Sequence, residues 1–164
     1  MPPVQPVKPG PGQESVWDYP RPPRLEAVSK GIQVKLGGLT VADTARAYRV
    51  LETSHPPVYY IPQADIHMDL LEPTSRHSFC EWKGRASYWT LRANGQVLPN
   101  VAWGYLNPSP GFKDIAGYLA FYLEPLEGFV DGEKARPQPG RFYGGWVTSD
   151  VVGPFKGEPG TEGW

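Results

Sequence analysis

Hydrophobic and polar residues alternate over several short segments of the chain. Residues 32–36 read Ile-Gln-Val-Lys-Leu, in which every second side chain is apolar. A period of two predicts a half-buried strand, because successive side chains of a strand point to opposite faces. Gly37-Gly38 follows directly and favours a hairpin turn, so we expect a second strand to run back beside the first.

The segment 45–52 carries conflicting signals. Ala, Arg, Leu and Glu are frequent in it and favour a helix. A similar segment later in the chain contains Gly104 and runs into two prolines, which a helix interior tolerates poorly. We therefore predict a strand over 45–52, which the His55-Pro56-Pro57 sequence breaks and which resumes over 58–61.

The remaining elements are also short. Apolar residues at helical spacing predict one or two helical turns over 63–71, ending at Glu72-Pro73. Asn94-Gly95 predicts a hairpin. We expect the longest strand over 79–91, further strands over 118–123 and around 129–130, and a helical turn over 112–117. Residues 142–147 predict a final strand or an aromatic loop that closes the domain. Short strands separated by turn residues predict a mainly β fold, an antiparallel sandwich or barrel.

Two stretches of the chain resemble each other at a constant spacing. Residues 38–48 and 95–105 share Gly, an apolar residue, Asp or Asn, Ala and Tyr at matching positions. Two copies are too few for a solenoid, but they suit two half-domains related by a pseudo-twofold axis. We therefore predict two pseudo-symmetric halves, over about 30–62 and about 83–125.

Composition narrows the class of protein. The chain has 164 residues, 40% of them hydrophobic, which suffices for one packed domain, and its 20 prolines and 19 glycines argue against long helices. The net charge is −1 without runs of like charge, so we expect no nucleic-acid or membrane partner. One cysteine cannot form an internal disulfide, and no signal peptide is visible. We expect a cytoplasmic monomer or homodimer.

The two ends of the chain differ from its middle. Residues 1–14 are rich in proline and glycine and predict a disordered tail, and we expect 157–164 to be a flexible C-terminal tail. A single β-rich domain then spans 15–156. Residues 17–24 predict a polyproline-like arm that is anchored on this domain by its aromatic side chains. The alternative is an interaction module that uses this arm to bind a protein partner.

Several blocks of the sequence resemble a known family. They are residues 50–62, 78–89, 102–105, 115–122 and 142–150. In this order they are similar to the signature blocks of domain of unknown function 427 (DUF427), and the resemblance covers about residues 15–156. The family also carries a provisional label as a nucleotidyltransferase-like domain. The resemblance implies a small β-rich cytoplasmic fold, mostly bacterial, and brings no established substrate or catalytic residue.

The predicted strands bring polar and aromatic residues to one face. If 45–52 is a strand, Arg46, Tyr48 and Glu52 share a face, and Trp103 and Tyr105 occupy the equivalent face of the second half. We expect a cavity between the halves that binds a small polar or aromatic metabolite. Its candidate lining residues are Arg46, Tyr48, Glu52, Tyr60, Lys83, Trp103 and Tyr105. The alternative is that the aromatic side chains fill the core.

Catalysis is a competing hypothesis. Cys80 could act as a nucleophile if a base such as His55 lay near it, since a thiolate needs a neighbouring base or cation. Lys83, which precedes a glycine, could bind a phosphate or carboxylate. A lone cysteine is more often a buried small hydrophobe, and a lysine at the start of a strand is often solvated. These alternatives stay open.

Metal and nucleotide chemistry have little support in the sequence. Three histidines and one cysteine show no paired zinc-ligand spacing, so we expect no metal and no cofactor. Nucleotidyl transfer usually needs carboxylates that hold magnesium and a glycine-rich or basic phosphate cradle. Neither G-x-x-x-x-G-K-[ST] nor G-x-G-x-x-G occurs. A nucleotidyltransferase is therefore only the second alternative to ligand binding.

Overall fold

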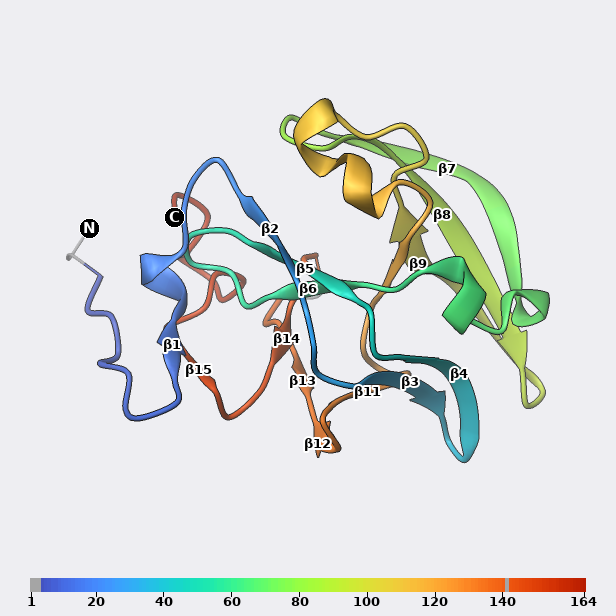
Figure 1. Cartoon of the computed structure of the whole chain (residues 1–164), viewed down its shortest axis with the longest axis horizontal. Coiled ribbons are helices and arrows are strands. Elements are labelled where there is room, and N and C mark those ends of the chain that lie inside the picture. The colour runs from blue at the N-terminus through green and yellow to red at the C-terminus, as the bar shows by residue number, and fades with distance from the viewer. Residues whose placement is uncertain (1–3, 141) are drawn as a thin grey trace.

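The computed structural model describes residues 4–140 and 142–164 and confirms a mainly β fold (Figure 1). Its helical elements are the short 3-10 helices η1 (Val16–Asp18), η2 (Gln63–Asp65), η3 (Met68–Leu70) and η4 (Pro110–Ile115). The strands are β1 (Glu14–Ser15), β2 (Arg24–Ala27), β3 (Ile32–Leu36), β4 (Leu39–Thr44), β5 (Tyr48–Leu51), β6 (Val58–Tyr60), β7 (Leu71–Cys80), β8 (Gly84–Ala93), β9 (Gln96–Gly104), β10 (Leu119–Phe121), β11 (Glu127–Val130), β12 (Glu133–Lys134), β13 (Arg136–Pro137), β14 (Trp146–Val147) and β15 (Val151–Val152). None of the helices in these residues is long and apolar enough to cross a membrane.

One bridge connects two sheets into a larger surface. The three strands β2-β5-β6 and the four strands β10-β9-β8-β7 meet where Ile61 and Leu119 exchange backbone hydrogen bonds of 2.8 and 2.9 Å. We call the result the joined sheet. The sheet β12-β11-β3-β4 packs against one of its faces, in a sandwich-like arrangement.

Alternation along the strands gives the joined sheet two different faces. Tyr59, Ala102 and Leu119 point into the main core, where they pack with β3, β4 and β11. Their chain neighbours Tyr60 and Trp103 point the other way, into a separate aromatic cluster. Tyr59 and Tyr60 therefore pack on opposite faces of the joined sheet.

The predicted local structure holds in several places. Residues 32–36 form β3, whose hairpin turns at Gly37 with a φ of 59°. Asn94-Gly95, with φ values of 53° and 71°, closes the hairpin of β8 and β9. The strand predicted over 45–52 exists, although it begins only at Tyr48.

One of the predicted elements is wrong. The strand over 79–91 is in fact two strands, because 81–83 forms a turn and Gly84 adopts a φ of 104°, a conformation that favours glycine. The helical turns predicted over 63–71 are present as η2 and η3, and Pro73 lies in the strand that follows them, β7. This strand is the edge of its sheet, and an edge strand tolerates a residue that cannot donate a ladder hydrogen bond.

The two similar stretches, residues 38–48 and 95–105, have the same structure over only part of their length. The hairpins β3–β4 and β8–β9 both turn at the shared glycine position. Beyond it the stretches differ, since β4 stops at Thr44 and β5 starts at Tyr48, whereas β9 runs unbroken to Gly104. Internal duplication therefore stays a prediction.

The N-terminal and C-terminal segments lie side by side, on the left of Figure 1. Glu14, which we had assigned to the tail, pairs through β1 with β15 in parallel, and the Val7 N–H donates to the Gly153 carbonyl at 2.8 Å. At the other end, the Trp164 ring meets the Trp17 ring edge-on, with centroids 5.1 Å apart. Residues 1–3 of the expected tail lie outside the described residues.

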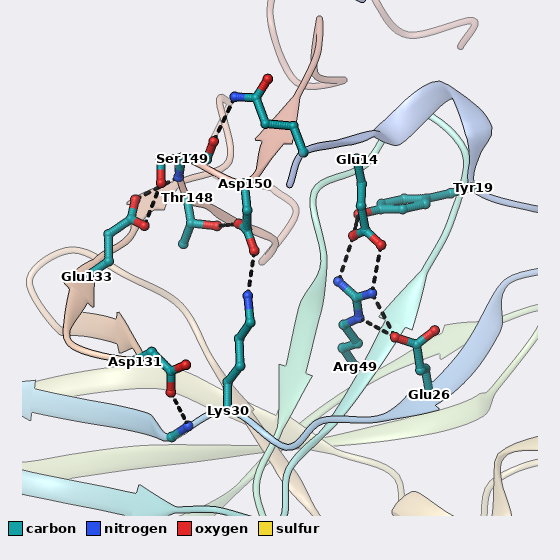
Figure 2. Close-up of polar contacts among 12 residues, drawn as sticks. Glu14, Tyr19, Glu26, Lys30, Arg49, Asp131, Glu133, Thr148, Ser149 and Asp150 are labelled. Atoms are coloured by element: carbon teal, nitrogen blue, oxygen red, sulfur yellow. Dashed lines mark hydrogen bonds and ion pairs between the residues drawn. The ribbon is translucent and has the colours of Figure 1, made fainter. Parts of the chain in front are cut away.

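Ion pairs attach the N-terminal segment to the body, as Figure 2 shows. Arg49 on β5 donates to Glu14 at 2.9 and 3.1 Å and to Glu26 on β2 at 2.9 and 2.7 Å. The hydroxyl of Tyr19 donates to Glu14 as well, at 2.9 Å. A single guanidinium therefore connects β1, β2 and β5.

Candidate functional site

A cavity of about 1070 Å³ opens on the face of the joined sheet that points away from the main core. Its wall is largely aromatic, because alternation sends large rings from the strands to this face and residues that follow the strands add others. These rings include Tyr60, Tyr88, Trp103, Tyr105 and Tyr122. We call this space the aromatic cavity. Strands that are far apart in sequence line it, and the Ile61–Leu119 bridge brings them together.

The rings of the aromatic cavity are held against one another. The Tyr60 centroid lies 6.4 Å from that of Trp103 and 6.3 Å from that of Tyr105, and Trp103 lies 4.4 Å from Tyr122. Burial raises the pKa of Tyr60 and raises that of Tyr122 to about 12. Their hydroxyl groups therefore stay protonated at neutral pH and can donate hydrogen bonds.

The C-terminal loop around 138–145 forms a further wall. Gly144 comes so close to Trp103 that a Cβ on it would overlap the indole ring. The Gly145 N–H donates to Gln138 Oε1 at 3.0 Å, which holds the loop in place. A smaller cavity of about 540 Å³ shares Tyr122 and Gly144 with the aromatic cavity. Because Gly144 and Gly145 have no side chain, this loop can pack closely against the rest of the cavity wall.

Two exposed phenylalanines stand at the mouth of the aromatic cavity. Phe79 on β7 is 78% exposed, Phe142 in the loop is 73% exposed, and both line the cavity. Residues that line a cavity while facing solvent form its rim. Both rings are thus free to contact a molecule that enters.

Lys83 lines the aromatic cavity and is only 8% exposed. It ends the turn between β7 and β8, and its carbonyl accepts a hydrogen bond from the Ser109 N–H at 3.1 Å. Its Nζ lies 5.7 Å from the ring centroid of Tyr105 and 5.9 Å from that of Phe112. Because 81–83 is a turn and not a strand, the consecutive residues Cys80, Glu81, Trp82 and Lys83 can all line the cavity.

His55 is buried beside the same cavity. Its Nδ1 lies 2.9 Å from the Thr53 carbonyl, which can only accept, so Nδ1 carries the hydrogen and Nε2 is left with a lone pair. Burial lowers the pKa of His55, against the opposing effect of the Glu52 carboxylate, whose Oε2 lies 4.0 Å from Nδ1. The imidazole is therefore neutral at neutral pH and able to accept a proton or a hydrogen bond.

Cys80 ends β7 and is partly exposed in the aromatic cavity. It shares this cavity with His55, but no hydrogen bond joins the two side chains in the described residues. The structure thus places both candidates of the catalytic hypothesis on one surface without pairing them.

Five of the seven predicted lining residues do line the cavity. They are Glu52, Tyr60, Lys83, Trp103 and Tyr105. Arg46 does not: it is exposed and forms an ion pair with Asp65, with Nε 2.9 Å from Oδ2. The reason is that β5 starts only at Tyr48, so alternation does not extend to Arg46. Tyr48 packs against the ring of Tyr118, with centroids 5.8 Å apart, outside the cavity lining.

Sequence reasoning missed part of the lining. Tyr88 follows the same alternation as Ala86 and could have been found from the strand pattern of β8. Arg76, Tyr122 and Lys156 gave no such signal, because their approach depends on strand pairing and on the path of the C-terminal loop. Among the described residues, no group of three or more His, Cys, Asp or Glu side chains is placed to hold a metal ion.

Comparison with known proteins identifies a family. The family described as a domain of unknown function (DUF427) matches residues 24–132, about two thirds of the chain. No curated protein matches the chain. The matched region contains the joined sheet and most of the aromatic cavity, while the loop that closes the cavity follows it. The chain therefore belongs to the DUF427 family, as the sequence blocks indicated.

Proposed function

We propose that this protein binds a small, ring-bearing metabolite in the aromatic cavity. The observation that carries the proposal is a cavity of about 1070 Å³ whose lining includes nine Phe, Tyr and Trp side chains. Ligand pockets generally measure about 300–1,000 Å³ and are lined mainly by apolar and aromatic side chains with a small number of polar groups. This cavity lies just above that range, and its aromatic lining also carries several charged side chains.

The arrangement suits a flat ligand with polar substituents. Trp103 and Tyr122 line the cavity with their rings 4.4 Å apart, and a planar body would pack against the parts of these rings that face the cavity. Protonated tyrosine hydroxyls can donate, and Nε2 of His55 can accept, so polar groups on the ligand find partners of both kinds. The rim residues Phe79 and Phe142 would cover the part of the ligand that faces solvent.

A panel of small metabolites tests the proposal. We expect at least one ring-bearing compound to raise the melting temperature of the wild-type protein, because a ligand that binds only the folded state stabilises it. Trp103→Leu should weaken binding of that compound about tenfold or more, through loss of the stacking ring. Isothermal titration calorimetry measures the change.

Tyr48→Leu is the matched control for this experiment. It also removes a ring from the aromatic cluster, but Tyr48 lies outside the cavity lining, so affinity should stay within about twofold. Trp103 is itself buried, so each variant is first checked for a cooperative unfolding transition. A panel in which no ring compound stabilises the wild-type protein would contradict the proposal.

Catalysis through Cys80 is the second candidate function, because Cys80 and a neutral His55 line one cavity. If His55 acts as its base, iodoacetamide should alkylate Cys80 at pH 7 faster than it alkylates glutathione, and His55→Gln should slow the reaction. Mass spectrometry of the modified peptide gives the rate. Equal rates for Cys80 in both proteins would exclude this pairing.

The nucleotidyltransferase alternative has no comparable observation behind it. Such transfer relies on magnesium held by carboxylates, and the described residues gather no such group.

A further inference from the structure

The charge of Lys83 is the least compensated in the described part of the chain. It is the only buried residue there among the lysines, arginines, aspartates and glutamates. Other cations that are removed from solvent have carboxylate partners, as Arg49 has in Glu14 and Glu26. No ion pair or side-chain hydrogen bond of Lys83 is found among the described residues. A buried charge without a partner is costly, so its retention points to a role.

The backbone around Lys83 holds its ammonium group inside the aromatic cavity. Gly84 adopts a φ of 104° next to it, and the Ser109 N–H binds the Lys83 carbonyl. The neighbouring Glu81 is exposed, whereas Lys83 is turned inward. The rings of Tyr105 and Phe112 lie within 6 Å of Nζ and stabilise a cation, but they do not accept strong hydrogen bonds. The N–H donors of the ammonium group are thus available to a ligand.

We propose that Lys83 binds the anionic group of the ligand, so that the cavity selects ring compounds that carry a carboxylate or a phosphate. This inference rests on the proposed function for the ring, while the anion contact itself depends only on Lys83. Two further cations line the cavity, namely Arg76, stacked over Tyr88 at 4.8 Å, and Lys156. Three carboxylates line it as well: Glu52 already pairs with Arg21 at 3.5 Å, while Glu81 and Glu124 form no ion pair among the described residues.

Lysine suits this role for a physical reason. An ammonium group acts as a point charge that binds carboxylate or phosphate oxygens without demanding a forked geometry. Lys83 itself is only 8% exposed, and a contact to a charge that is largely removed from water is stronger than the same contact in water. A neutral ring compound of the same shape would leave this charge unpaired and should bind more weakly.

Four probe compounds separate the contribution of the ring to the binding affinity from the contribution of the charge. They are benzyl alcohol, benzoate, phenyl phosphate and inorganic phosphate, each titrated into isotope-labelled full-length protein and followed by amide chemical shifts. We expect benzoate or phenyl phosphate to bind at least about tenfold more tightly than benzyl alcohol, with shifts at Lys83, Gly84 and Tyr105. The stronger of the two anions identifies carboxylate or phosphate as the natural group.

Lys83→Met keeps an unbranched side chain, one atom shorter, and removes its charge. It should abolish the preference for the anion and leave benzyl alcohol binding unchanged. Lys113→Met is the matched control, because Lys113 is exposed on η4 next to Phe112 and does not line the cavity. Its effect on either anion should stay within about twofold.

The outcomes distinguish this inference from the proposed function. If neither benzoate nor phenyl phosphate binds more tightly than benzyl alcohol, or if Lys83→Met binds the anions as wild type does, the anion site is refuted while ring binding stands. If inorganic phosphate alone shifts Lys83 and no ring compound binds, the anion site stands and the ring proposal fails. No binding of any anion at millimolar concentration overturns the inference.

Discussion

Replacing Trp146 with alanine should lower the free energy of unfolding by about 4 kcal/mol, as is typical for removal of a fully buried tryptophan. Trp146 is 2% exposed and lies in the main core, with its ring 5.3 Å from that of Tyr59. Its indole N–H donates to the Phe121 carbonyl at 3.1 Å. The ring fills the space above Gly128, where a Cβ would come within 2.8 Å of it. Urea denaturation measures the loss.

Trp146 lies beyond residues 24–132, the range that the family model matches. The core of the matched region is thus completed by a side chain from outside it. Trp82→Ala is the control, since Trp82 is only partly buried in the turn between β7 and β8. This change should lower the free energy of unfolding by about 1 kcal/mol. Losses of equal size in the two variants would mean that the C-terminal segment does not complete the core.

Replacing Arg49 with methionine should lower the free energy of unfolding by about 2 kcal/mol at pH 7. The guanidinium donates four hydrogen bonds to Glu14 and Glu26 (Figure 2), and its side chain is 14% exposed. Both carboxylates are more than a third exposed, so water can partly solvate them after the change and limit the loss. Arg92→Met is the control, because its pair with Glu72 is exposed on both sides and should contribute less than about 0.5 kcal/mol.

The acid dependence of stability gives a second measurement of the same contact. Hydrogen bonds from Arg49 lower the pKa of Glu14, although burial acts in the opposite direction. A carboxylate with a lowered pKa stabilises the fold above its unfolded pKa and loses this effect as the pH falls through its folded pKa. Wild-type stability should therefore decline below about pH 4, and Arg49→Met should decline less steeply.

Asp150 adds to this decline and does not depend on Arg49. Burial would raise the pKa of Asp150, but hydrogen bonds from Lys30 and Thr148 outweigh it and lower that pKa. Arg49→Met should therefore keep part of the acid sensitivity. Identical slopes for wild type and Arg49→Met between pH 5 and about pH 2 would show that the contact with Glu14 contributes nothing.

Much of the fold could be read from local patterns. Alternation over 32–36 and the Asn94-Gly95 turn depend on neighbours in the chain, and both are present as predicted. The prediction of one strand over 79–91 was wrong because an alternating pattern does not show where the chain turns back. The chain turns back just before Gly84, whose positive φ the turn uses. The helical turns over 63–71 are also present as predicted, but the strand that contains Pro73 could not be predicted, because a proline is tolerated there only since β7 is an edge strand, which the sheet order reveals.

The candidate site divides in the same way. The sequence by itself determined which large aromatic side chains share a face of one strand, since a period of two sends Trp103 and Tyr105 to the same side. The tertiary structure alone decided that the strands that line the cavity share a sheet, because the Ile61–Leu119 bridge joins residues distant in the chain. It also decided that Arg46 pairs with Asp65 at the surface and that the 138–145 loop closes the cavity. Such contacts form between segments whose meeting is set by the packing of the whole chain, and no local pattern encodes them.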